Sequence, residues 1–203
     1  MKPLVISSIF LITFLLISES SARPESVIMG PYKVSFDLNT TQKYTINVSQ
    51  PESGQTYGGV KFVMYEMWLE NTSLNYSLAS IGVTFFGTSM DGSAQVMKSE
   101  IQEYLSSKGY YSNKDYDRII DKKPGILGVG ENPNRITLFQ ALYWSHDDTK
   151  VDIISIYPWE PETLGLLNSI HVELTDKPSI HGSNMTTESD AKPRGLEKGC
   201  HCR

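Results

Sequence analysis

The stretch SHDDT, residues 145–149, holds the side chains best suited to chemistry. His146, Asp147 and Asp148 are adjacent there, and an imidazole with two carboxylates can bind a metal ion or form an acid–base pair. Consecutive side chains point in different directions, however, and Asp-Asp-Thr is a common composition of tight turns. We therefore predict a turn between two strands here, and no bound metal or cofactor.

A second group of candidate metal ligands stands near the C-terminal end, as Cys200, His201 and Cys202. Two thiolates and one imidazole could hold a soft metal ion, although a structural zinc site needs a fourth ligand. Cys200 or Cys202 could instead link two chains in a disulfide-bonded dimer. The third alternative is that these residues have no role. These are the two cysteines of the chain, so packing rather than disulfides must stabilise the rest of it.

The glycine-rich stretch DRIIDKKPGILGVG, residues 117–130, has the composition of a phosphate-binding loop. Its lysines precede the glycines, however, no Ser or Thr follows them, and the next segment has a strand pattern instead of a helix pattern. We predict a hairpin with its turn at Pro124 and Gly125. Gly128 and Gly130 then lie on one face of the following strand, where small residues allow close packing.

No arrangement for nucleophilic catalysis is visible in the sequence, which has neither a cysteine before residue 200 nor a Gly-x-Ser-x-Gly elbow. Two carboxylates from distant strands could still meet, as glycoside hydrolysis requires. The 11 tyrosines could line a sugar-binding face, although strands are rich in tyrosine for structural reasons.

The N-terminal residues are typical of a secretory signal peptide. Lys2 precedes an apolar core at residues 4–17, and Ser20 and Ala22 stand at the −3 and −1 positions of a cleavage site. We therefore predict a signal peptide at residues 1–22, with an uncleaved membrane anchor as the alternative.

Glycosylation sequons support a secreted or cell-surface location. The five Asn-x-Ser/Thr sequons begin at Asn39, Asn47, Asn71, Asn75 and Asn184. The net charge of −5 is mild and there is no basic stripe, so nucleic acid is not expected as a partner. The expected partner is a protein or glycan at the cell surface.

Hydrophobic periodicity predicts one α+β domain at residues 31–175, preceded by a short linker at 23–30 and followed by a disordered tail at 176–203. A helix is expected within residues 89–109, with Ser89 or Asp91 as its N-cap and Gly109 at its end. Apolar residues recur there at three- and four-residue spacing, namely Val96, Met97, Ile101, Tyr104 and Leu105. A shorter helix is expected at 160–169, beginning with Pro161 and placing Leu164 and Leu167 on one face. The expected strands are 32–38 and 43–49, taken as a hairpin, followed after a loop at 50–59 by 60–71, 78–87, 116–121, 125–131, 135–145, 150–159 and 170–174.

This order of elements, with IDKKPGILG (120–128), ALYWSHDDTKVDIISIYP (141–158) and TLGLLNSIHV (163–172), resembles the PsbP-like α/β/α sandwich over residues 31–175. It is also similar to small exported proteins of unknown role from methane-producing archaea. The resemblance implies a mainly antiparallel sheet with one long helix and one short C-terminal helix packed on it. Members of the superfamily are mostly non-catalytic and dock on larger assemblies, and no set of functional residues transfers to this chain.

Taken together, these observations favour a non-enzymatic binding or accessory module of unknown ligand. The alternative is an extracellular hydrolase that acts on polysaccharide or another envelope substrate. A concave pocket lined by two carboxylates would favour the hydrolase.

Overall fold

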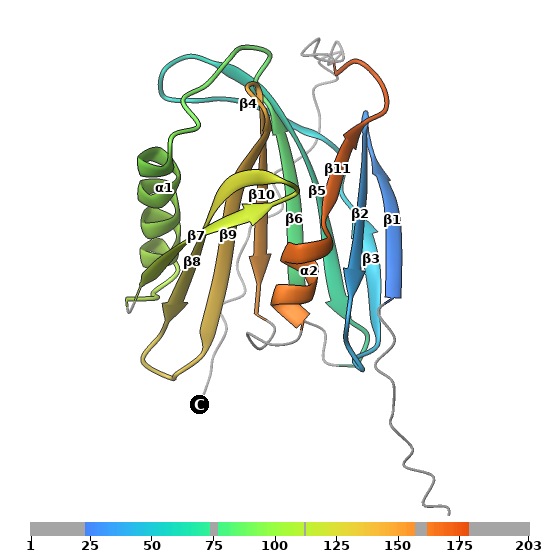
Figure 1. Ribbon diagram of the computed structural model, residues 1–203, viewed down its shortest axis with the longest axis vertical. Helices are drawn as coiled ribbons and strands as arrows, with labels where there is room; N and C mark the ends of the chain where they lie inside the picture. Colours follow the sequence, from blue (N-terminus) through green and yellow to red (C-terminus); the bar gives the residue numbers. More distant parts are fainter. Residues whose placement is uncertain (1–22, 74–76, 112, 157–161, 179–203) are drawn as a thin grey trace, which may run out of the picture.

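The computed structural model describes residues 23–73, 77–111, 113–156 and 162–178. They form an α+β structure that is mainly antiparallel β-sheet, with one long helix and one short helix. Figure 1 shows the large sheet between helix α1 on one side and a small sheet on the other.

Two sheets are present among the described residues. The small sheet has the order β1-β2-β11, and its strands are Arg23–Met29, Tyr32–Leu38 and His171–Leu174. The large sheet has the order β3-β5-β6-β10-β9-β8-β7, with β4 also paired to β5. Its strands are β3 (Tyr44–Val48), β4 (Glu52–Gln55), β5 (Lys61–Asn71), β6 (Ser77–Phe85), β7 (Lys114–Ile120), β8 (Lys123–Glu131), β9 (Thr137–His146) and β10 (Thr149–Ser155).

The linker predicted at residues 23–30 is wrong for most of its length, because these residues form strand β1. This strand pairs with β2 along its whole length, with Val27 opposite Val34. Met29 is fully buried, whereas Ile28 is 60% exposed. The segment begins with polar residues and has a proline at its second position, so it lacks the alternating apolar pattern by which strands are predicted.

The hairpin predicted from residues 32–38 and 43–49 is also wrong. Both segments are strands, but β2 pairs with β1 and β11 in the small sheet, whereas β3 pairs with β5 in the large sheet. The chain therefore crosses between sheets after Leu38. The loop predicted at 50–59 contains the short strand β4.

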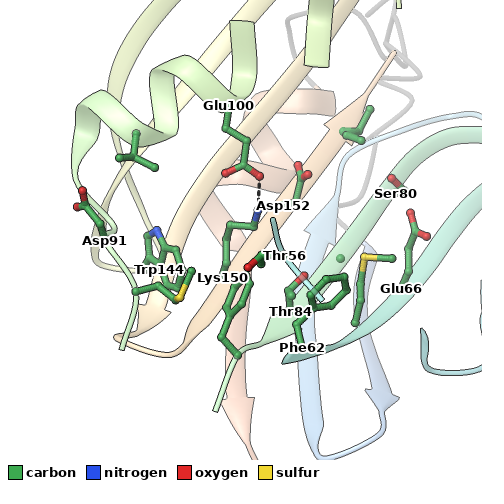
Figure 2. Close-up of a pocket in the computed structure, with 16 residues that line it drawn as sticks. Thr56, Phe62, Glu66, Ser80, Thr84, Asp91, Glu100, Trp144, Lys150 and Asp152 are labelled. Carbon is green, nitrogen blue, oxygen red and sulfur yellow. Dashed lines mark hydrogen bonds and ion pairs between the residues drawn. The ribbon is translucent and has the colours of Figure 1, made fainter. Parts of the chain in front are cut away.

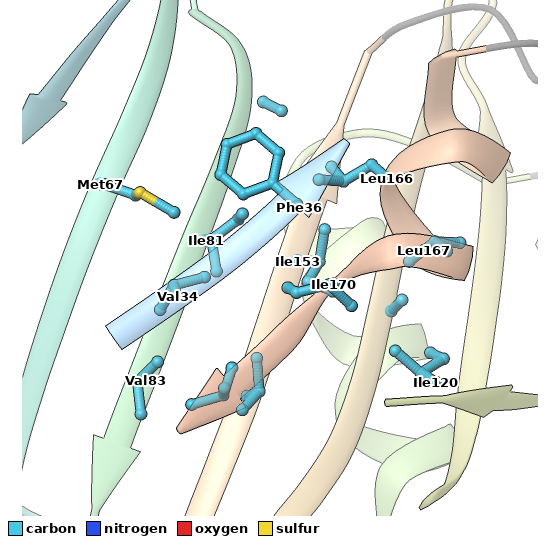
Figure 3. Close-up of a cluster of buried hydrophobic side chains, with 14 of the residues drawn as sticks. Val34, Phe36, Met67, Ile81, Val83, Ile120, Ile153, Leu166, Leu167 and Ile170 are labelled. Carbon is cyan, nitrogen blue, oxygen red and sulfur yellow. The ribbon is translucent and has the colours of Figure 1, made fainter. Parts of the chain in front are cut away.

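The main hydrophobic core lies between the two sheets (Figure 3). Alternate residues of β2 point into it, with Val34, Phe36 and Leu38 buried. Ile81 and Val83 of β6 reach it from the large sheet. Helix α2 (Leu164–Ser169) adds Leu166 and Leu167 to the same core. Of the two leucines predicted to share its buried face, Leu167 is buried and Leu164 is only partly buried.

The glycine-rich stretch forms the β7–β8 hairpin, as predicted. Its turn is displaced from the predicted position, however, because Ile120 pairs with Lys123 and leaves Asp121 and Lys122 as a two-residue loop. These two residues have φ values of 50° and 61°, as a type I′ hairpin turn requires. The Asp121 carboxylate accepts a hydrogen bond from the Val172 backbone N–H (3.0 Å), so the turn is tied to the small sheet.

Helix α1 (Ala94–Ser107) packs on the opposite, outer face of the large sheet, where it contacts β8 and β9. Its buried residues Met97, Ile101 and Leu105 are among those whose periodicity predicts the helix. The N-cap is Ser93, a few residues after the predicted Ser89 or Asp91, and Asp91 instead accepts a hydrogen bond from the Ser93 backbone N–H.

The predicted close packing at the β8 glycines is confirmed. A Cβ atom on Gly128 would lie 2.1 Å from Ile101 Cγ2, and one on Gly130 would lie 2.8 Å from Tyr110 Cβ. The glycines therefore let the helix approach the strand closely. Within the described ranges, no helix has both the length and the apolar composition needed to cross a membrane.

Candidate binding groove

A groove lies on the outer face of the large sheet, beside α1. The helix covers β8 and β9, and β10, β6 and β5 continue the same face beyond it. The groove between the helix edge and these strands has a volume of about 460 Å³. Figure 2 shows Glu100 reaching into it from the helix, with Asp152 and Glu66 reaching in from the sheet.

Two acidic side chains stand on either side of a glycine in the floor of this groove. Glu66 on β5 and Asp152 on β10 are both paired in register with Gly82 on β6. Their backbones are thus two strand spacings apart, or about 10 Å. Gly82 has no side chain between them, and a Cβ placed there would meet its nearest atom, the Asp152 carbonyl oxygen, at 3.9 Å. The floor between the two carboxyl groups is open.

An apolar wall stands beside these carboxyl groups. The rings of Phe62 and Phe86 lie 6.1 Å apart, and those of Phe86 and Trp144 lie 5.6 Å apart. The Gly92 backbone packs on the indole so closely that a Cβ on this residue would lie 2.6 Å from Trp144 Cδ1. This contact holds the ring in place, and the three rings form a continuous aromatic surface along the groove.

The groove contains an ion pair between sheet and helix. Lys150 is in register with Thr84 and Trp144, and its Nζ donates to Glu100 Oε1 on α1 (Figure 2). The Lys150 side chain is largely buried and that of Glu100 is partly exposed. The pair fixes this part of the helix over β10.

Asp152 is held in a position that disfavours its charged form. Burial is the main cause, and together with the nearby Glu100 and Glu66 it raises the pKa of the carboxyl group to about 7, although Lys150 and Gln140 oppose the shift. The Gln140 side-chain amide lies 3.1 and 3.2 Å from the two carboxylate oxygens and orients the group. Gln140 is 1% exposed. A carboxyl group with this pKa exchanges its proton near neutral pH.

The same cause acts on two neighbouring groups. Burial raises the pKa of Glu66, against a hydrogen bond from Ser80. Burial also raises the pKa of Tyr104 on α1, and the negative charges of Asp152 and Glu66 add to this effect. The groove therefore concentrates acidic groups in surroundings that solvate their charges poorly.

The structure places His146, Asp147 and Asp148 away from this groove, in the β9–β10 turn. His146 pairs with Thr149, so Asp147 and Asp148 form a two-residue loop, and the predicted turn is confirmed. Their backbone carbonyls accept hydrogen bonds from Met90 and Phe86. Among the described residues, no three His, Cys, Asp or Glu side chains come together in a way that could hold a metal ion.

Three of the predicted glycosylation sites lie within the described residues. Asn39 is partly buried just after β2. Asn47 is exposed on β3, whereas Asn71 is 7% exposed and donates from Nδ2 to Gln42 Oε1 (2.9 Å). Nδ2 is the atom that would carry a glycan, and in Asn47 it also donates a hydrogen bond, to Glu70 Oε2 (2.6 Å). Exposure is therefore what makes Asn47 better placed for modification than Asn71. Asn75, Asn184, Cys200, His201 and Cys202 lie outside the described residues.

Glu66 and Asp152 were not predicted as site residues from the sequence. They are 86 positions apart, and only strand pairing brings them to the same row of the sheet. A local signal was present, because each is an acidic residue inside an otherwise mostly apolar strand, in the stretches MYEMW (64–68) and VDIIS (151–155). A charge at such a position is uncommon without a partner or a function.

No protein-family model, curated protein or solved structure matches this chain. The chemistry of the groove is therefore the basis for assigning a function.

Proposed function

We propose that the protein is a secreted or cell-surface binding module that takes a small ligand in the groove between α1 and β5. The observation that carries this proposal is the open stretch of floor at Gly82, bordered by aromatic rings and by carboxyl groups from two strands. No enzymatic step is part of this function.

The dimensions and chemistry of the groove support the proposal. Its volume of about 460 Å³ falls within the range of small-molecule sites, which are mostly apolar and have a few convergent polar groups. The Lys150–Glu100 pair and the Gln140–Asp152 contact hold polar groups in position without a ligand. Preorganised side chains of this kind lose little conformational entropy on binding.

The PsbP-like sandwich is the finer fold that we propose, and the placement of the helices supports it. Helix α1 packs on one face of the large sheet through β8 and β9, and α2 joins the core on the other face. The proposal includes export through a signal peptide at residues 1–22 and an accessory role on a protein or glycan partner. A disulfide-linked dimer through Cys200 or Cys202 remains a prediction.

Filling the floor of the groove should weaken ligand binding strongly. In the Gly82→Leu variant the new side chain would occupy the space between Glu66 and Asp152. Strand β6 tolerates it because the nearest atom beyond the neighbouring residues, the Asp152 carbonyl oxygen, lies 3.9 Å from the new Cβ. We expect the affinity for small aromatic fragments, such as phenethyl alcohol and phenethylammonium, to fall at least about tenfold. Chemical-shift changes in two-dimensional NMR spectra would measure this.

The control is Glu103→Leu, at an exposed position of α1 outside the groove lining. This variant should bind the fragments as the original chain does. If neither fragment perturbs the amides of β5, β6 and β10 in the original chain, the groove is not a ligand site and the proposal fails.

A second candidate function is hydrolysis of a glycosidic bond by Glu66 and Asp152. The specific observation in its favour is that two carboxyl groups with raised pKa values flank an open floor in a groove with an aromatic wall. A carboxylic acid that holds its proton near neutral pH can protonate a leaving group, while a second carboxylate acts as base or nucleophile.

Release of nitrophenol from a panel of nitrophenyl glycosides tests this second candidate. If the groove is an active site, Glu66→Gln and Asp152→Asn should each lower the rate at least about a hundredfold, whereas the exposed Glu103→Gln on α1 should not change it. A rate that is unaffected by Glu66→Gln and Asp152→Asn would exclude this chemistry.

A further inference from the structure

We propose that the ligand of the groove is an organic cation, an ammonium group attached to an apolar body. This inference rests on the proposed binding function and specifies the chemical class of its ligand. The feature that carries it is the balance of charges around the cavity, together with the position of the two carboxyl groups at its floor.

The lining of the groove has more acidic than basic groups. Among the described residues that line it, the acidic ones are Glu66, Asp91, Glu100 and Asp152, and Lys150 is the single basic residue. The Lys150 ammonium is bonded to Glu100. It influences Asp152 through its electric field, but its bonded partner is the helix carboxylate.

Glu66 and Asp152 are therefore left with neutral hydrogen-bond donors. Gln140 donates to Asp152 through its amide, and Ser80 provides the hydrogen bond to Glu66. Burying a carboxylate is unfavourable unless a positive charge compensates it. A ligand ammonium above Gly82 would stand between the two carboxylates and supply that charge.

The rest of the cavity suits the apolar part of such a ligand. Phe62, Phe86 and Trp144 provide aromatic surface beside the acidic floor, and aromatic faces attract cations as well as apolar groups. An anionic ligand would place its charge next to two carboxyl groups at close range, which is unfavourable. The combination therefore selects positive charge at one end of the ligand and apolar surface at the other.

Three probes of the same shape and different charge test this assignment: phenethylammonium, phenethyl alcohol and phenylacetate. Their dissociation constants would be measured at pH 8 from chemical-shift changes in NMR spectra of the full chain. We expect the ammonium to bind about tenfold more tightly than the alcohol, and phenylacetate to bind most weakly.

Variants test which residues cause the preference for the ammonium over the alcohol. Asp152→Asn keeps the shape of the side chain and should reduce the ammonium-to-alcohol preference to about threefold or less, while the affinity for the alcohol stays within about twofold. Glu66→Gln should have the same effect, so the test stands even if one variant does not fold. The matched control is Glu103→Gln on the exposed side of α1, which should leave the preference unchanged.

The outcomes separate this inference from the function on which it rests. If the alcohol or phenylacetate binds in the groove as tightly as the ammonium, the groove is a ligand site but the cation assignment is wrong. If the preference survives in both Asp152→Asn and Glu66→Gln, the positive charge is recognised elsewhere and the assignment is also wrong. If none of the three probes binds, the binding function itself is overturned.

Discussion

Replacing Asp152 with Asn should raise the free energy of unfolding at pH 8 by about 3 kcal/mol and leave it nearly unchanged at pH 4. The reason is that folding raises the pKa of this carboxyl group from 3.8 to about 7. At pH 8 the folded protein must carry a poorly solvated charge at this position. Asparagine has the same shape without the charge, and it can still accept a hydrogen bond from Gln140.

The direction of the pH dependence follows from the raised pKa. The folded state binds the proton more tightly than the unfolded state, so the stabilisation by the protonated group is complete below about pH 4. It is lost as the pH rises from about 4 through 7, and above pH 7 the loss is complete. Each unit of pKa difference corresponds to about 1.4 kcal/mol. Water in the groove screens part of the charge. We therefore expect a free-energy change smaller than the pKa difference multiplied by this value.

Urea denaturation at pH 4, 6 and 8, followed by tryptophan fluorescence, measures these free energies. The control is Asp117→Asn, because Asp117 is an exposed residue that pairs with Lys98 at 3.1 Å. This variant should change stability by less than about 1 kcal/mol at every pH. A stabilisation by Asp152→Asn that is equal at all three pH values would contradict the prediction.

The Gly128→Val variant should lower the free energy of unfolding by about 3 kcal/mol. Helix α1 packs directly on this glycine, and a Cβ there would lie 2.1 Å from Ile101 Cγ2 and 3.4 Å from Leu105 Cδ1. Both contacts come from buried residues of the helix. The added side chain must therefore push the helix away from β8, which would also change the edge of the groove. Urea denaturation measures the loss.

A double variant tests this cause. Ile101→Ala removes the atom that the new valine would strike, so the Gly128→Val/Ile101→Ala chain should be more stable than the sum of the two single effects indicates. If the two effects simply add, the glycine is not needed for helix packing and the explanation is wrong.

The local elements of this fold were predictable from the sequence. The four-residue spacing of Met97, Ile101 and Leu105 predicted α1, because this stripe faces the sheet along the helix. The β7–β8 and β9–β10 hairpins were predictable because short polar segments separate strands that pair with their sequence neighbours. The turn at Asp121 and Lys122 was missed, since Pro124 and Gly125, which follow after Lys123, offered a more usual turn composition.

The partners of β2 and the groove were not predictable in the same way. An alternating strand has the same local pattern whether it pairs with the next segment or crosses to another sheet, so nothing within residues 32–49 separated the two cases. The sequence around Glu66 and around Asp152 indicates only that an acidic residue interrupts an apolar strand. Their relation to Gly82 depends on the register of three strands, which is a property of the assembled sheet.

Strand β2 lies between β1 and β11, so the first and last strands of the described structure belong to the same small sheet. During synthesis the large sheet can form before residues 171–174 exist, but one edge of β2 stays unpaired until they emerge from the ribosome. Leu166 and Leu167 also arrive late, immediately before this strand. Folding must then join segments almost 140 positions apart, and such non-local pairing is slow. A nascent chain that stops short of β11 exposes apolar core surface and a free strand edge, which makes it a target for chaperones and for aggregation.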